Sequence, residues 1–392
     1  MTILLLAVAV FLVQAGFHGY TATLPLALSR GGVPDATIGL VVGVSAVVQI
    51  PAAVVGGRLV DRFGGYRLFT TGTLAFLVGS LILASPAVEP QASLAPFIVA
   101  RLFQGAGLAL TLPAALSLVP ALVRPDGQVN GLSIVGAAGN LTLVVLPPLS
   151  LLVLDAAGLH AVAVMVTAFL LAGLVAFGLM RSRAAAPVRA ATTAARRFGI
   201  VFRRSWGAPL LITMLYVAHW GAVTAYLPIK TEGTGADVGL YFAADGVAIF
   251  FMRMPTAWLA RRYTSRTLMA VGIALTAFAI GLLLLPLSTP LLIVAGLLGG
   301  GASAPVLSPI LFELNRRSDD AVRGSAFALY SGALAGAVSL GSIGGAPIVA
   351  AYGLSAALAG GIALILVALV VTLADPSLRR IVTTSRAPAE AP

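Results

Sequence analysis

The sequence lacks cysteine altogether and has only three histidines among its 392 residues. Without cysteine the chain can form no disulfide bond, no thiol nucleophile and no cysteine-based metal site. The three histidines form no visible metal-binding cluster, and no spacing of serine, histidine and aspartate typical of a nucleophilic enzyme is legible. We therefore expect no metal, no cofactor and no enzymatic activity.

A nucleotide-binding motif is also missing. The glycine-rich residues 296–305 (GLLGGGASAP) lack the Lys-Ser/Thr ending and the preceding strand that a phosphate-binding loop needs. Close packing and bending of helices explain such glycines and prolines better. An ATP-driven pump is therefore excluded unless a partner protein supplies the ATPase.

Charge is scarce as well: 9% of the residues are charged, 59% are hydrophobic and the mean hydropathy is +1.03. Such a chain is too apolar for a water-soluble core. Apolar stretches of about 20 residues recur, as helices crossing a bilayer of about 30 Å require. We predict an all-α integral membrane protein with twelve transmembrane helices. They are expected near residues 3–28, 36–57, 68–86, 93–121, 130–154, 159–180, 207–228, 238–260, 267–287, 290–314, 324–350 and 354–374.

The net charge of +11 does not indicate a nucleic-acid partner, because the basic residues are spread over short loops and no soluble domain carries a binding face. They fall on alternate connections and on the tail, whereas the other connections carry only Arg30 and Lys230. By the positive-inside rule both termini and the long middle loop are cytoplasmic. We expect a multi-pass protein of a bacterial inner (plasma) membrane, embedded in the lipid bilayer and acting as a monomer.

The chain reads as two related halves. TATLP at residues 21–25 recurs as TAYLP at 224–228, and RPDGQVNG at 124–131 is echoed by RSDDAVRG at 317–324. Repeated bundles around a midplane cavity are how many secondary transporters are built. The predicted divisions are a six-helix bundle at 1–180, a cytoplasmic linker at 181–206, a second six-helix bundle at 207–375 and a cytoplasmic tail at 376–392.

Two motifs stand out in the first half: RLFQGAG at residues 101–107 and GRLVDRFGGYR at residues 57–67. Both resemble signatures of the major facilitator superfamily. RLFQGAG at residues 101–107 is similar to a signature frequent in its proton-coupled drug and metabolite efflux members. GRLVDRFGGYR at 57–67, after the second helix, resembles its loop signature. The resemblance covers the whole chain and implies two pseudo-symmetric six-helix bundles with a gate at that loop. The matching gate residues are Gly57, Asp61, Arg62, Gly64 and Arg67.

Two departures from the family pattern stand out. Exporters that exchange substrate for protons carry a Gly-Pro pair and then paired glycines in the fifth helix. In this sequence Pro147 replaces a glycine, and Leu151 and Leu152 occupy the positions where the family pattern has small residues. Small residues let helices approach closely, so this departure counts against antiport. The second-half echo of the loop, ARRYTSR at 260–266, keeps the bases and loses the acid. The two halves are therefore not equivalent.

In this family the acid of the loop, here Asp61, contacts the start of the eleventh helix, here Gly324 and Ser325, when the cytoplasmic side is shut. A carboxylate at a helix N-terminus gains about 0.3–1 kcal/mol. Because the contact exists in one conformation only, it would bias the equilibrium between the two. For the neighbouring arginines, simple anchoring on the cytoplasmic side is an equal alternative.

Ionisable residues inside the predicted helices are few: Arg101, Asp245 and Arg253, with Glu313 near a helix end. Each costs at least about 2.5–3.5 kcal/mol at membrane depth and is a functional candidate by default. Asp245 and Arg253 are eight residues apart on one helix face, so they could form a packing ion pair. Arg101 could instead donate to backbone carbonyls of a neighbouring helix. Asp245, the only carboxylate well inside a helix, is our best candidate for proton coupling.

Polar residues form stripes on two helices. On the first they follow spacings of four and three, and on the seventh spacings of three, four and three. Such stripes face protein or water rather than lipid, which predicts a cavity lining, although a lone histidine or asparagine is as often a packing residue. His219 could also titrate near neutrality and share in proton transfer. The predicted cavity residues are Gln14, His18, Thr21, Asn140, Tyr216, His219, Trp220 and Tyr226.

These features favour a secondary active transporter that works by alternating access and exports a small amphipathic or hydrophobic organic compound, with the proton gradient as energy source. Uptake or uncoupled facilitated diffusion of a small metabolite is the alternative, because the exporter signature is broken and the first helix has no acid. A non-transporting membrane receptor or scaffold is a third class. The linker and the tail are short for a signalling segment, which disfavours it.

Overall fold

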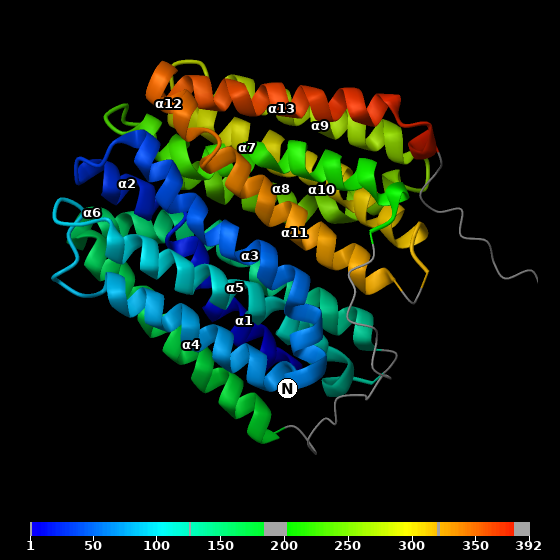
Figure 1. The fold of residues 1–392 in the computed structure, drawn as a ribbon, viewed down its shortest axis with the longest axis horizontal. Coiled ribbons are helices and arrows are strands. Elements are labelled where there is room, and N and C mark those ends of the chain that lie inside the picture. Colours follow the sequence, from blue (N-terminus) through cyan, green and yellow to red (C-terminus); the bar gives the residue numbers. More distant parts are fainter. Residues whose placement is uncertain (1, 125–126, 184–201, 320–321, 380–392) are drawn as a thin grey trace, which may run out of the picture.

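The computed structural model describes residues 2–124, 127–183, 202–319 and 322–379 (Figure 1). Those residues form α-helices and short 3-10 turns, with no strand among them. The first half contains α1 (Thr2–Gly19), α2 (Thr23–Arg30), α3 (Asp35–Phe63), α4 (Gly65–Leu83), α5 (Ala95–Leu122) and α6 (Gln128–Arg183). The second half contains α7 (Gly207–Thr231), α8 (Val238–Leu259), α9 (Ser265–Leu282), α10 (Thr289–Arg316), α11 (Arg323–Ser342), α12 (Ala346–Tyr352) and α13 (Leu354–Ala374).

Twelve membrane crossings result from these helices. The described residues contain eleven stretches long and apolar enough to span a bilayer, and α1 with α2, like α11 with α12, makes one of them. One stretch, Asn130–Ser182, has 53 residues, about 80 Å of helix against a bilayer of about 30 Å. It is broken at Gly158, whose φ of 78° only glycine adopts freely, so the chain turns back there. The prediction of an all-helical membrane protein is confirmed.

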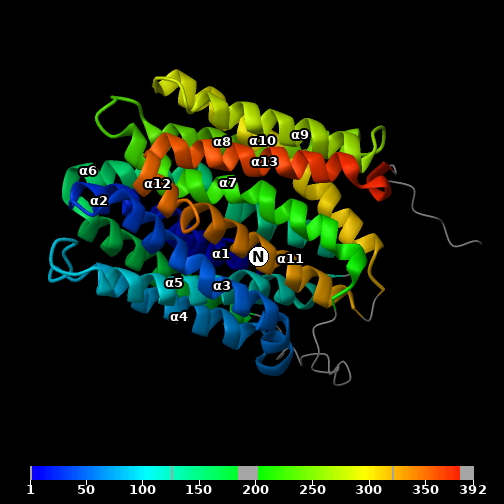
Figure 2. The same cartoon turned by 45° about the horizontal axis from the view of Figure 1, so that its top comes forward.

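Each half packs mainly on itself. α1 packs on α6 and α4 on α5, while α8 packs on α10 and α7 on α11 and α13. Figures 1 and 2 show the blue-to-cyan helices on one side and the yellow-to-red helices on the other. Contacts between the halves come mainly from α3 on α11 and from α6 on α8. A cavity between the halves is therefore walled by these two helix pairs.

The end of α3 differs from the prediction. The helix continues to Phe63, so Gly57, Asp61 and Arg62 of the gate signature lie on its last two turns rather than in a loop, and Arg67 lies in the first turn of α4. Gly64 alone, with a φ of 79° and a ψ of 151°, joins α3 to α4. Because this backbone conformation is strained for any residue with a Cβ, the signature glycine at this position has a local structural reason.

Glycines of α5 allow neighbouring helices to approach closely. A Cβ added to Gly105 would lie 2.2 Å from the carbonyl oxygen of Ser45 on α3, and one added to Gly107 would lie 2.5 Å from that of Gly72 on α4. The signature at residues 101–107 thus places α5 between α3 and α4 and fixes where Arg101 meets α3.

We expect Gly105→Ala to lower stability by about 1–3 kcal/mol, because the new methyl group would push the α3 backbone away. Thermal unfolding in detergent measures the change. Gly178→Ala is the matched control, since a Cβ at this helical glycine of α6 meets nothing within 4 Å. It should leave stability equal or slightly higher. A Gly105→Ala variant as stable as the Gly178→Ala variant would contradict the tight α3–α5 contact.

Glu313 is a structural acid at the end of α10. It is fully buried, and its carboxylate accepts hydrogen bonds from Arg316 at 2.5 Å and from Arg317 at 3.1 Å. Ser265 at the start of α9 donates to its other oxygen at 3.2 Å. Arg317 also donates to the Ser205 carbonyl oxygen at 2.6 Å, so the network ties α9, α10 and the beginning of the second half together.

The predicted linker and tail are described only in part. α6 continues to Arg183 and the 3-10 turn Arg204–Trp206 begins the second half, while residues 184–201 lie outside the described residues. A further 3-10 turn, Pro376–Arg379, ends the described chain, and residues 380–392 also lie outside it. The predicted boundaries of the two bundles therefore stay predictions.

Candidate functional site

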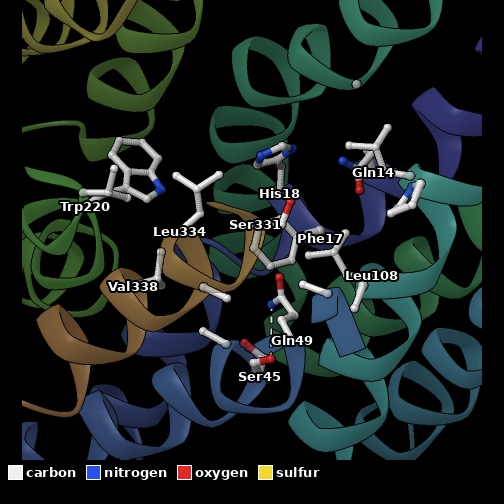
Figure 3. Close-up of a pocket in the computed structure, with 18 of the residues that line it drawn as sticks. Gln14, Phe17, His18, Ser45, Gln49, Leu108, Trp220, Ser331, Leu334 and Val338 are labelled. Carbon is white, nitrogen blue, oxygen red and sulfur yellow. Dashed lines mark hydrogen bonds between the residues drawn. The ribbon is translucent and has the colours of Figure 1, made fainter. Parts of the chain in front are cut away.

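A cavity of about 760 Å³ lies between the two halves (Figure 3). Its walls come from α1, α3, α5, α6, α7, α8 and α11, with apolar side chains in the majority. The polar side chains that line it are Gln14, His18, Tyr20, Thr21, Ser45, Gln49, Arg101, Asn140, Trp220, Thr224, Arg253 and Ser331.

The cavity opens at one face of the molecule. We call the end where α1 begins and α13 ends the terminal face, and the other end the opposite face. Gly324 and Phe327, in the first turns of α11 at the terminal face, line the cavity and are exposed. Arg253, in the last turns of α8, is also exposed on the wall. The cavity is therefore accessible from the terminal face.

At the opposite face the halves are in contact. The Tyr226 hydroxyl of α7 donates to the carbonyl oxygen of Ser342 on α11 at 2.5 Å, and a Cβ on Gly39 of α3 would lie 2.0 Å from the Tyr226 hydroxyl oxygen. Further along α3, a Cβ on Gly43 would lie 2.5 Å from the Ser342 Oγ. Backbone-to-backbone approach of α3 and α11 thus shuts this face.

An ion cluster also links the halves there. Arg30, the last residue of α2, donates to Asp155 at 2.7 Å and to Glu232, just after α7, at 2.9 Å. All three side chains are more than a third exposed, so each pair contributes only about 0–1 kcal/mol. The cluster supports the closed face but does not by itself close it.

The α6–α8 contact explains how the chain tolerates the departure seen at Leu151. A Cβ on Gly239 of α8 would lie 2.8 Å from the Pro148 Cα and 3.1 Å from the Leu151 Cδ1. Two turns further along α8, a Cβ on Gly246 would lie 2.9 Å from the Val144 Cγ2. The small residues that permit close approach therefore lie on α8, across from the positions where the family signature has them.

The stripe predicted on the first helix lines the cavity. Gln14, His18 and Thr21 all face it, and Figure 3 shows His18 between Gln14 and Trp220. Asn140 of α6 also lines it. His18 lies 2.6 Å from the Thr142 hydroxyl through its Nδ1, and that hydroxyl donates its single proton to the Gly139 carbonyl oxygen at 2.5 Å. Nδ1 must therefore be the donor, which leaves Nε2 of neutral His18 as a hydrogen-bond acceptor.

The stripe predicted on the seventh helix lies elsewhere. Tyr216 is buried with its hydroxyl 3.0 Å from that of Thr276 on α9, His219 is buried with Nδ1 against the Tyr216 carbonyl oxygen, and Tyr226 belongs to the closed face. The α7 residues that line the cavity are Val217, Trp220 and Thr224. The correction has a physical reason: α7 contacts α11, α13 and α3, so only a narrow strip of it is free.

Ser45 and Gln49 on α3 were missed by the sequence reasoning. Both line the cavity, where Gln49 donates to the Ser45 carbonyl oxygen at 3.1 Å. Their spacing of four on an otherwise apolar helix was the available signal. Serine in helices often bonds its own backbone, as Ser45 does with the Val42 carbonyl oxygen at 3.2 Å, so that signal is weak.

Arg101 of α5 is buried at 6% exposure and lines the cavity. It donates to the Gln104 Oε1 at 3.0 Å, to the Val42 carbonyl oxygen at 3.1 Å and to the Ser45 Oγ at 2.6 Å. The bond to Val42 is the predicted contact with a neighbouring backbone. All these partners are neutral, so nothing in this set offsets the charge.

Asp245 of α8 is 4% exposed, and its Oδ2 has no hydrogen-bond partner among the described residues. It faces α10, where a Cβ on Gly300 would lie 2.2 Å from the Asp245 carbonyl oxygen. Arg253 forms no ion pair with it within the described chain, since Arg253 points to the cavity and Asp245 does not line it. The packing ion pair considered from the sequence is absent there.

The gate signature is described in part. Arg62 and Arg67 are exposed at the terminal face, and the Arg62 guanidinium lies 5.2 Å from the Phe63 ring centre. Gly57 and Asp61 lie on α3, but the Asp61 side chain and the surroundings of Gly57 fall outside what the structure describes. The proposed contact of Asp61 with Gly324 therefore stays a prediction.

Residues 6–272 match the family model of the Major Facilitator Superfamily. The chain belongs to this superfamily. The resemblance inferred from the two motifs is thereby confirmed, and the cavity between the halves is the cavity of a superfamily transporter. With its apolar, membrane-length helices, the chain is a multi-pass membrane protein.

Two characterised relatives match short stretches of the chain. A stretch of 140 residues is 35% identical to the lincomycin resistance protein of Streptomyces lincolnensis and covers 35% of this chain and 28% of that protein. A stretch of 147 residues is 26% identical to the inner membrane transport protein YajR of Escherichia coli strain K12 and covers 36% of this chain and 31% of that protein. The match thus spans less than a third of the length of either relative.

Solved structures match along the whole chain. The nucleoside transporter NupG superposes with a TM-score of 0.79 at 13% identity, covering 95% of this chain and 99% of that one. A POT family transporter in complex with 5-aminolevulinic acid superposes with a TM-score of 0.79 at 15% identity, covering 97% of this chain and 96% of that one. Identities this low show a shared fold, and the predicted fold of two six-helix bundles is confirmed.

Proposed function

We propose that this superfamily member is a proton-coupled exporter of a small amphipathic compound, working by alternating access in a bacterial inner membrane. The observation that carries the proposal is Asp245, a buried carboxylate with an unpartnered oxygen on a membrane-spanning helix. An ionised carboxylate without a partner is costly at that depth, whereas a protonated one is not. A group of this kind is suited to bind and release one proton per cycle.

Asp245 does not line the cavity, but its helix is packed against a residue of the cavity wall. Phe242, three residues earlier on α8, packs edge-on against Trp220 with ring centres 5.8 Å apart, and Trp220 lines the cavity. Gly300 holds the α10 backbone against Asp245 itself. A change in the charge of Asp245 therefore acts on a tightly packed α8–α10 pair that also supports the cavity wall.

The open face supports the proposed direction of transport. The basic residues gather at the terminal face, so the positive-inside rule assigns that face to the cytoplasm. A cavity open there loads a compound from the cytoplasm. The mainly apolar lining suits an amphipathic compound, and the similarity to a lincomycin resistance protein supports export.

Uptake or uncoupled facilitated diffusion is the second candidate. It is favoured by one observation: Asp245 does not line the cavity, so substrate and proton do not compete for one group. Relatives of the fold include nucleoside and peptide transporters, which makes a metabolite a reasonable substrate under this alternative.

Proteoliposomes with an imposed pH difference distinguish the two candidates. One pH unit is worth about 1.4 kcal/mol per proton, so one-for-one exchange should accumulate substrate about tenfold in a lumen one unit more acidic. The probes are radiolabelled lincomycin, uridine, dialanine and 4-phenylbutyrate, with protein-free liposomes correcting for passive pH trapping. Accumulation driven by an acidic exterior would indicate symport, and equal concentrations on both sides would indicate facilitated diffusion.

A further inference from the structure

The deep part of the cavity contains hydrogen-bond donors that lack acceptors. Arg101 Nε and Tyr20 Oη are buried, and neither has a hydrogen-bond partner within the described residues. Gln104 Nε2 is likewise unpartnered, but Gln104 lies beside Arg101 and does not line the cavity. Arg101 and Tyr20 line the cavity and lie close enough to interact electrostatically. Buried donors in folded proteins are normally paired, and an unpaired one is destabilising. Two of them on residues of one cavity wall indicate a missing acceptor there.

The charge around these donors is also unbalanced. Arg101 forms no ion pair with any described carboxylate, and it donates hydrogen bonds to an amide, a backbone carbonyl and a hydroxyl. No described residue that lines the cavity is Asp or Glu, whereas Arg101 and Arg253 are both basic. A buried cation is normally paired. The missing acceptor should therefore carry negative charge.

The other residues that line the cavity indicate the chemistry of the rest of a ligand that carries the negative charge. Phe17, Leu108, Leu112, Phe327 and Leu334 cover the wall between Arg101 and the terminal face. Arg253 is exposed nearer the opening, where a cation raises the local concentration of anions. The cavity thus offers one deep anion site and an apolar channel leading to it.

We propose that Arg101 and Tyr20 form an anion-binding subsite, and that the transported compound is an amphipath with a single carboxylate or equivalent anionic group. The inference rests on the proposed function in one respect, since it takes this cavity as the substrate site. The anionic group docks against Arg101 at the deep end and the apolar body lies toward the terminal face. Cationic amphipaths bind weakly, because none of the described residues that line the cavity is an acid that could pair with them.

The test compares three compounds with one apolar body: 4-phenylbutyrate, 4-phenylbutanamide and 4-phenylbutylamine. Binding to purified protein in detergent is measured with radiolabelled 4-phenylbutyrate and competition by the other two. We expect the carboxylate to bind at least about tenfold more tightly than the amide or the amine, as a charge-assisted hydrogen bond provides. Equal affinities, a preference for the amine, or no binding of any of them would overturn the proposal.

Substitutions identify the residues that cause the preference for the carboxylate. Arg101→Gln should abolish it. Arg261→Gln, the same change at an exposed arginine that does not line the cavity, is the control and should leave it unchanged. Arg253→Gln, at the solvated cavity arginine, should lower it less than Arg101→Gln does. Tyr20→Phe covers the case that Arg101 variants fail to fold. It removes an unpartnered hydroxyl, so thermal stability should be kept while carboxylate affinity falls by about tenfold. A preference that survives both Arg101→Gln and Tyr20→Phe, or that follows Arg253, would overturn the proposal.

This measurement is independent of transport. If proteoliposomes show no coupled flux but the carboxylate preference follows Arg101, the anion subsite stands and the proposed transport mode fails. If flux is coupled to protons but headgroup charge does not affect binding, the subsite fails alone.

Discussion

Asp245→Asn is expected to reduce the pH-driven accumulation of a transported compound from about tenfold per pH unit to about onefold, because the amide cannot carry the proton that the gradient supplies. Exchange of labelled against unlabelled compound at equal pH should continue. The amide is nearly isosteric with the protonated acid, and the tight contact with Gly300 is made by the backbone of residue 245, which the substitution leaves unchanged. Both quantities are measured in the same proteoliposome preparation, so protein insertion cancels.

Asp237→Asn is the matched control on the same helix. Asp237 caps the N-terminus of α8 by accepting hydrogen bonds from the backbone N–H of Gly239 at 2.8 Å and of Leu240 at 3.4 Å. Asparagine caps a helix about as well as aspartate, so accumulation should remain near the wild-type value. Wild-type accumulation in Asp245→Asn would assign proton coupling to another group. Loss of equal-pH exchange together with accumulation would point to a packing role for Asp245.

The sequence predicted the helices well because a bilayer imposes one approximate length on every crossing. The same reasoning placed Gln14, His18 and Thr21 on one face of the first helix. It erred at the end of α3, where charged residues were assigned to a loop although the helix continues to Phe63. Charge marks where a helix leaves the membrane, but it does not mark where the helix ends.

The polar stripe on α7 was misplaced for a different reason. Its most apolar stretch is 67% buried, against 33–50% for the other spans. On so enclosed a helix, Tyr216 and Tyr226 find partners on neighbouring helices and need no water-filled cavity. Helical periodicity indicates that one face of a helix is polar. It does not indicate whether water or a neighbouring helix supplies the hydrogen-bond partners of that face.

The unpartnered donors at Arg101 and Tyr20 lay beyond the reach of the sequence. The sequence shows a single arginine in this helix. Whether a carboxylate lies near it depends on which helices pack around it, and the sequence does not show that. The close α6–α8 contact is similar: its glycines, Gly239 and Gly246, lie on the helix opposite the one where the family signature has them. Both features depend on helix pairs that only the fold defines.

A reversible cross-link between α3 and α11 is expected to stop transport completely. The pair is Gly43→Cys with Ser342→Cys. A Cβ at position 43 lies 2.5 Å from the Ser342 Oγ, close to the separation of about 3 Å between a Cβ and the partner sulfur in a disulfide. The chain has no cysteine of its own, so oxidation can form only the intended bond. The bond would hold the opposite face shut, and alternating access requires that face to open.

The matched control is Gly65→Cys with Ser117→Cys, which joins α4 to α5 within the first half, where a Cβ at position 65 lies 2.6 Å from the Ser117 Oγ. If the halves move as units, oxidation of this pair should leave flux near that of its reduced form. Flux through the α3–α11 pair should fall to that of protein-free liposomes when oxidised and return after treatment with dithiothreitol. Continued flux through the oxidised α3–α11 pair would mean that the compound crosses without separation of Gly43 from Ser342, and alternating access about this contact would be wrong. Loss of flux in both pairs would instead show that each six-helix half must deform internally during transport.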